Sequence, residues 1–188
     1  MNRNSLSRRS FLSASAAGLG LVAQGMPARR VLGASQRVRI GMIGLGGRGS
    51  DLFRMVLRRA GDQNDVEVAA LCDVYRKRLN AAAEHAPEAK TYLHHQELLE
   101  RNDLDAVFIA TPDHWHAPLT LAAMQSGKDV YCEKPMTLHW EDAKEVARQA
   151  RELNRVLQIG VQALSWSKWY KVKEIVDRGM LGKIVICQ

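Results

Sequence analysis

The sequence contains little cysteine. Its three cysteines, Cys72, Cys132 and Cys187, are spaced in neither a CxxC motif nor a zinc-binding pattern. Each lies at or near the end of a short apolar run, which favours small buried hydrophobic residues over disulfides. Two histidines, His114 and His116, lie close together but have no third ligand nearby. The sequence therefore predicts no metal site.

The first 34 residues lack acidic side chains but contain five arginines. Without these arginines the formal net charge falls from +7 to +2, which predicts no nucleic-acid partner. Residues 7–12, SRRSFL, match the twin-arginine export pattern. The apolar stretch at 11–23 is too short for a membrane span. We expect an export leader at 1–34 and periplasmic localisation by the twin-arginine pathway; the alternative is a disordered basic tail.

Strand and helix patterns alternate after a linker at 35–37. The expected strands are 38–43, 66–72, 91–92, 106–110, 129–132 and 156–161. The expected helices are 52–60, stopped by Gly61, then 76–84, 96–101, 117–125 and one beginning at Trp140. This alternation predicts an α/β fold with a doubly wound parallel sheet, a Rossmann domain over 35–161.

The remaining residues, 162–188, follow a different pattern. They predict one helix at 169–178, a turn at 179–182 and one strand at 184–187. One helix and one strand cannot bury a core alone. We therefore expect this segment to be the first helix and strand of a second α/β domain that the chain does not complete.

The run from Val38 to Gly49, VRIGMIGLGGRG, joins the first strand to the first helix. In this context Gly44 is expected to form the tight turn, Gly46 to allow a pyrophosphate close to the backbone, and Gly49 to let the helix pack on the sheet. The amides at the helix start, including those of Gly47 and Arg48, would face the phosphates. The alternative is a plain glycine-rich turn between strand and helix.

Asp73 ends the second strand, 24 residues after Gly49. This is near the position of the acid that binds the adenosine ribose, and it favours NAD because a carboxylate repels a 2′-phosphate. The basic run at 76–78 leaves NADP possible. A helix cap is the alternative role for Asp73.

Two polar segments follow later strands at the same expected sheet edge. One begins with Thr111 and Pro112 and ends at His116; the other is Glu133-Lys134-Pro135. Ligands of such sheets bind outside the carboxyl ends of the strands, so both segments are expected to border the cofactor. Lys134 is a candidate acid–base group. A solvated Glu-Lys pair is the alternative interpretation.

These motifs together resemble the Gfo/Idh/MocA family of NAD(P)-dependent oxidoreductases. The resemblance rests on GLGGRG, Asp73, TPDHWH and above all GKDVYCEKP at 127–135, with GVQ at 160–162 and RGMLGKI at 178–184. It implies the following cofactor-binding residues: Gly44, Gly46, Gly47, Arg48, Gly49, Asp73, Thr111, Pro112, His116, Glu133, Lys134 and Gln162. Lys134 would also reach the substrate, while Ala163-Leu164 replaces an arginine that many members have.

The resemblance implies hydride transfer between a nicotinamide cofactor and a sugar, polyol or related hydroxy compound. It also implies a second domain that covers the substrate and often forms a homo-oligomer interface. The family's second acid–base residue would lie beyond Gln188, so we expect this chain to bind cofactor without turnover. The alternatives are a redox-neutral NAD-dependent glycosidase of the same fold and a dinucleotide-binding module without catalysis.

Overall fold

The structure is a computed structural model that describes residues 37–162 and 166–186. The predicted leader and Cys187 lie outside these residues. The elements in chain order are β1 Val38–Ile43, α2 Gly47–Gln63, β2 Val66–Cys72, α3 Arg76–His85, β3 Lys90–Tyr92, α4 His95–Leu99, β4 Ala106–Ile109, a 3-10 turn Asp113–Trp115, α5 His116–Gln125, β5 Asp129–Glu133, α6 Trp140–Glu152, β6 Leu157–Gly160 and α7 Ser167–Asp177.

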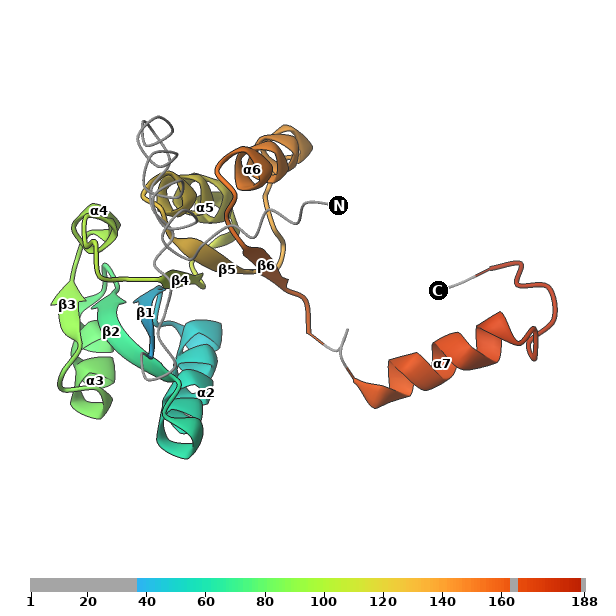
Figure 1. Cartoon of the computed structure of the whole chain (residues 1–188), viewed down its shortest axis with the longest axis horizontal. Helices are drawn as coiled ribbons and strands as arrows, with labels where there is room; N and C mark the ends of the chain where they lie inside the picture. The colour runs from blue at the N-terminus through green and yellow to red at the C-terminus, as the bar shows by residue number, and fades with distance from the viewer. Residues whose placement is uncertain (1–36, 163–165, 187–188) are drawn as a thin grey trace, which may run out of the picture. The chain divides into compact units, whose positions relative to one another are not determined.

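Six parallel strands form one sheet in the order β3-β2-β1-β4-β5-β6 (Figure 1). The chain leaves β1 toward one edge and returns to its other side at β4, so the strand order reverses between β1 and β4. Ile43 is in register with Cys72 on one side and with Ile109 on the other. The segments that follow these three strands therefore emerge side by side, and the predicted doubly wound α/β fold is confirmed.

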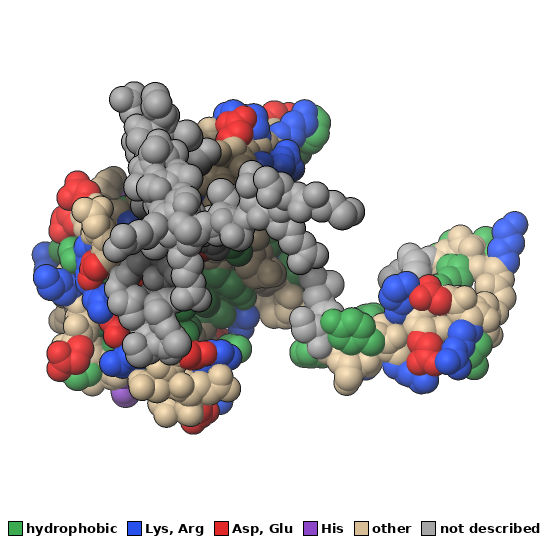
Figure 2. Space-filling view, viewed as in Figure 1, with side chains coloured by type: hydrophobic (Ala, Val, Ile, Leu, Met, Phe, Trp, Pro, Cys, Tyr) green, Lys and Arg blue, Asp and Glu red, His purple; other side chains and the backbone are tan. Residues whose placement is uncertain are grey.

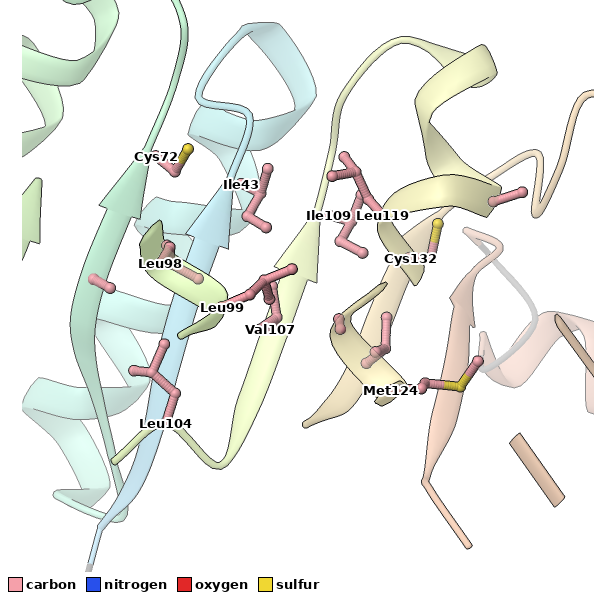
Figure 3. Packing of buried hydrophobic residues seen from close by; sticks show 14 of the residues in the cluster. Ile43, Cys72, Leu98, Leu99, Leu104, Val107, Ile109, Leu119, Met124 and Cys132 are labelled. Atoms are coloured by element: carbon pink, nitrogen blue, oxygen red, sulfur yellow. The ribbon is translucent and has the colours of Figure 1, made fainter. Parts of the chain in front are cut away.

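Two hydrophobic clusters pack on opposite faces of the sheet. Helices α2 and α3 cover one face with residues such as Phe53 and Leu79. Helices α4, α5 and α6 cover the other, where Leu98, Leu119 and Met124 pack against the strands (Figure 3). Side chains alternate between faces along each strand, so both faces of a central strand must be apolar. This explains why β2 is a nearly continuous hydrophobic run.

Helix α2 extends beyond the predicted stop at Gly61, which was wrong. The helix continues to Gln63 and ends at Asn64, whose φ is 53° and whose N–H donates to Ala60 O at 3.1 Å. A glycine inside a helix costs only about 1 kcal/mol relative to alanine. That cost does not break a helix packed on a sheet, whereas asparagine readily adopts the left-handed conformation that ends one.

The predicted strand at 184–187 was also wrong for its described part. Ile184, Val185 and Ile186 are exposed and form no strand. A strand requires a neighbour for its N–H and C=O groups, and none of the described residues pairs with this segment. Helix α7 forms close to its predicted bounds and buries none of its residues within the described chain.

Basic and acidic side chains lie intermixed on the face drawn in Figure 2. Exposed ion pairs such as Arg59–Asp65 and Arg148–Glu145 join many of them. Among the described helices, none is long and apolar enough to cross a membrane.

Candidate functional site

The turn out of β1 requires glycine at position 44. Gly44 has a φ of 88°, and its N–H donates to Cys72 O at 2.9 Å. A Cβ on this residue would lie 2.6 Å from Ala110 O. Both the left-handed conformation and the close backbone contact exclude a larger residue, so the chain turns tightly beside the ends of β2 and β4.

The other glycines of the loop divide into two kinds. A Cβ on Gly49 would lie 2.0 Å from Gly44 O and 3.4 Å from Ala110 Cβ, so the helix start packs directly on the turn. A Cβ on Gly46 would approach only Arg78, at 3.2 Å from Nη1, and one on Gly47 would meet no described atom within 4 Å. Gly46 and Gly47 thus leave open space in front of the first turn of α2.

That first turn has neither a side-chain cap nor an acidic residue. The first N–H groups of a helix have no partner inside the helix and carry its positive dipole end. A backbone-only cradle of this kind suits an anion such as a pyrophosphate. The loop geometry therefore fits a dinucleotide.

Asp73 binds the glycine-rich loop from the end of β2. Its Oδ2 accepts the Leu45 N–H and its Oδ1 the Tyr75 N–H, both at 2.8 Å, and the residue is 7% exposed. Helix α3 has no side-chain cap, so Asp73 does not serve as its cap. Each carboxylate oxygen can accept a further bond. Asp73 therefore has a structural role in holding the glycine-rich loop, and its binding of the ribose stays a prediction.

A groove of about 470 Å³ lies at the strand-order reversal. It brings together six of the predicted cofactor residues: Gly44, Gly46, Gly47, Asp73, Thr111 and Pro112. Arg78 and His95 also line it, together with Trp115 from the predicted segment after β4, and sequence reasoning did not place His95 there. A larger cavity of about 770 Å³ runs along α2 and α3 and contains none of those six residues.

Thr111 lines the groove and has a hydroxyl that no described group uses. Its Oγ1 is buried and has no hydrogen-bond partner in the described structure. An unpaired buried hydroxyl costs about 1–3 kcal/mol, which a ligand group in the groove would relieve. Together with the space in front of Gly46, this orphaned hydroxyl fits a bound dinucleotide.

His116 is not among the residues that line the groove. The residue is 1% exposed, with Nδ1 2.6 Å from Pro135 O and Nε2 2.9 Å from Thr111 O. Both neighbours are carbonyl acceptors, and a neutral ring has one N–H to donate to one of them. The side chain holds the segment after β4 against the turn after β5, so the described contacts of its ring are to backbone.

A second group of predicted residues surrounds Glu133 at the end of β5. Its carboxylate is buried, and Oε1 accepts from Arg48 Nε at 2.7 Å and from Tyr131 OH at 3.2 Å. Oε2 accepts the Lys134 N–H at 3.2 Å. The Lys134 side chain is exposed. Arg48, Glu133 and Lys134, predicted separately as cofactor residues, thus form one connected cluster.

Tyr131 and Gly160 belong to this cluster and were missed by sequence reasoning. A Cβ on Gly160 would lie 2.4 Å from Tyr131 OH and 2.8 Å from Glu133 Oε1. Burial raises the pKa of Tyr131, so its hydroxyl stays protonated and donates. The register of β5 with β6, which pairs Glu133 with Gly160, produces this contact. Gln162 is exposed just beyond β6.

The described residues contain no group of three or more side chains suited to a metal. Cys72 and Cys132 are buried free thiols, as predicted. Burial raises the pKa of Cys72 to about 12 and that of Cys132 to about 11. Neither thiol therefore forms a nucleophilic thiolate at neutral pH.

The fold and the groove define a dinucleotide-binding Rossmann domain. Residues 38–161 match the family model described as "Oxidoreductase family, NAD-binding Rossmann fold". The chain therefore belongs to the Gfo/Idh/MocA oxidoreductase family, as its motifs indicated.

Curated relatives agree with this assignment. The chain is 34% identical over 149 residues to the inositol 2-dehydrogenase of Salmonella typhimurium, covering 78% of this chain and 43% of that protein. It is 30% identical over 157 residues to an alpha-N-acetylgalactosaminidase of Shewanella oneidensis, covering 79% of this chain and 33% of that protein. The chain thus spans less than half the length of these relatives.

Solved structures share the fold. The myo-inositol 2-dehydrogenase of Lactobacillus plantarum superposes with a TM-score of 0.72 at 28% identity, over 80% of this chain and 44% of that one. A 3-ketoreductase of Actinomadura kijaniata, solved with NADP and TDP-benzene, gives a TM-score of 0.69 at 28% identity. The match covers 79% of this chain and 45% of that one.

Proposed function

We propose that this chain is the cofactor-binding part of an NAD(P)-dependent oxidoreductase that acts on a sugar, a polyol or a related hydroxy compound. The observation that carries the proposal is the groove at the strand-order reversal. Its glycine cradle follows β1, and Asp73 follows β2 on one side of that strand. The Glu133-Lys134 turn lies outside the groove, at the end of β5 on the other side of β1. In a doubly wound sheet these two sides take the two nucleotide halves.

Some residues of the chain would bind the cofactor, and Lys134 would transfer a proton. The open backbone at Gly46 and Gly47 would bind the pyrophosphate, and Asp73 would accept bonds from the adenosine ribose. When bound, the nicotinamide ring supplies hydride chemistry. Lys134, exposed next to the buried Glu133, would hold or move the proton of the substrate hydroxyl. We also propose that the protein assembles as a homo-oligomer.

NAD is proposed as the preferred cofactor because Asp73 lines the groove and a carboxylate there disfavours a 2′-phosphate. Arg78 lines the same groove and is the candidate partner for a 2′-phosphate. Titration of the protein with NAD and NADP by calorimetry tests this preference. Equal or tighter binding of NADP would overturn it, and loss of NADP binding in Arg78→Ala would identify the responsible side chain.

The proposed activity is tested by incubating the protein with NAD and polyols such as myo-inositol while recording NADH absorbance. For a protein that joins this chain to a substrate-binding domain, the expected result is NADH formation that Lys134→Ala greatly reduces, with NAD affinity retained. Unchanged turnover in Lys134→Ala would overturn the role of this lysine. A protein that binds neither NAD nor NADP would overturn the whole proposal.

A redox-neutral glycosidase is the second candidate because one relative is an alpha-N-acetylgalactosaminidase. Such an enzyme oxidises and re-reduces its substrate within one cycle and releases no net NADH. Release of N-acetylgalactosamine from its glycosides, dependent on bound NAD and without NADH accumulation, would establish this alternative.

Export belongs to the proposal as well. The SRRSFL pattern, the short apolar stretch after it and the absence of acids from residues 1–34 support a twin-arginine leader and a periplasmic protein. This pathway carries folded proteins, which suits a domain that acquires its cofactor before export.

A further inference from the structure

Arg48 occupies an unfavourable place for a cation. It lies in the first turn of α2, where the positive end of the helix dipole repels positive charge. Its guanidinium is instead paired with Glu133, and this hydrogen bond is the main cause that raises the pKa of Arg48. The two residues are 85 positions apart, so the pair joins the loop after β1 to the turn after β5.

The partner carboxylate is nearly inaccessible to solvent. The Glu133 side chain is 5% exposed, whereas that of Arg48 is 36% exposed. Removing the cation from a buried ion pair is costly, so the Glu133 side chain depends on Arg48 to hold its place. The same carboxylate binds the Lys134 N–H through Oε2. The position of the Lys134 backbone is therefore linked to Arg48 through one side chain.

Arg48 also lies outside the groove that holds the predicted phosphate-binding glycines. It lines the larger cavity along α2, while Gly46, Asp73 and Thr111 line the smaller one. Gly160 leaves room for the Arg48–Glu133 pair, because a Cβ on this residue would lie 2.8 Å from Glu133 Oε1. These contacts associate Arg48 with the nicotinamide half of the site rather than with the pyrophosphate.

We propose that Arg48 is a positioning residue that acts through Glu133 to fix the Lys134 turn, and that it does not bind the cofactor phosphates. This inference rests on the proposed dinucleotide site. ADP would occupy the adenosine and phosphate part of that site, whereas NAD would also need the turn after β5. Loss of Arg48 should therefore weaken NAD and leave ADP unaffected.

The test measures the Kd values of NAD and ADP by calorimetry for the wild-type chain, Arg48→Met, Glu133→Gln and the double variant. We expect the preference for NAD over ADP to fall about tenfold in each single variant and no further in the double variant, as coupled residues behave. Circular dichroism verifies folding. Arg58→Met, in the same helix and in the same larger cavity, is the matched control.

Each other outcome has a distinct meaning. Equal weakening of NAD and ADP in Arg48→Met would show that Arg48 binds phosphate and would overturn the inference. Unchanged affinities together with a lower melting temperature would show a purely structural pair and would also overturn it. A wild-type chain that binds neither nucleotide would instead refute the proposed function.

Discussion

The carbonyl oxygen of Gly44 lies 2.0 Å from where a Cβ on Gly49 would be. The start of α2 is thus pressed against the turn that precedes it. Gly61 lies in the same helix, and apart from its chain neighbours and the nearby helix backbone no described atom lies within 4 Å of its Cβ position. The two glycines provide a matched pair in which one substitution is blocked by backbone and the other is free.

We predict opposite effects for alanine at these two positions. Gly49→Ala should lower the free energy of unfolding by about 3 kcal/mol, because backbone must move to admit the methyl group. Gly61→Ala should raise it by about 0.5–1 kcal/mol, because alanine loses less conformational entropy in a helix. Urea denaturation measures both, and a Gly49→Ala protein as stable as wild type would refute the close packing.

Gly46→Val should prevent dinucleotide binding without unfolding the domain. The added side chain would meet the flexible end of Arg78 but also fill the space in front of the helix start. Affinity for NAD should fall at least about tenfold, since the pyrophosphate could no longer approach the backbone. Calorimetry on the folded variant measures this, with Gly61→Ala as the control; unaltered NAD binding would exclude the loop as the phosphate site.

Asp103 should make the protein sensitive to acid. Its carboxylate accepts bonds from Arg101 and Arg39, and the Arg101 bond is the main cause that lowers its pKa. A lowered pKa contributes stability above the unfolded value of about 4, and that contribution is lost as the pH falls. Because the side chain is 47% exposed, the gain is modest.

Urea unfolding of wild type and Asp103→Asn across pH measures this contribution. The wild type should be the more stable at about pH 6, and the difference should shrink toward about pH 2, because the Asp103 carboxylate of the unfolded chain takes up its proton at a higher pH than that of the folded chain. A difference that does not change with pH would assign the stabilisation to something other than the charge of Asp103.

Export should depend on the paired arginines of the leader. Replacing them together, Arg8→Lys with Arg9→Lys, should retain the protein in the cytoplasm of a host with the twin-arginine pathway. Cell fractionation measures the distribution, and Arg29→Lys with Arg30→Lys provides a charge-matched control. Undiminished periplasmic delivery of the Arg8/Arg9 variant would refute this route.

The sequence by itself determined the order of the elements and the kind of site. Apolar runs such as 66–72 identify strands buried on both faces, because only a sheet covered by helices can bury them. Gly44 and Gly49 were identifiable because a tight strand-to-helix turn leaves no room for side chains. Boundaries were less certain: Gly61 did not end its helix, since packing outweighs a propensity cost of about 1 kcal/mol.

Only the tertiary structure decided which residues act together. Arg48 and Glu133 are far apart in the chain, and no local pattern reveals that one neutralises the other. Gly160 resembles an ordinary strand glycine until the β5–β6 register sets it against Tyr131 and Glu133. The side chain of His116 contacts the backbone of Pro135 and Thr111. Periodicity reports which face of an element is apolar, whereas such pairings depend on how strands far apart in sequence align.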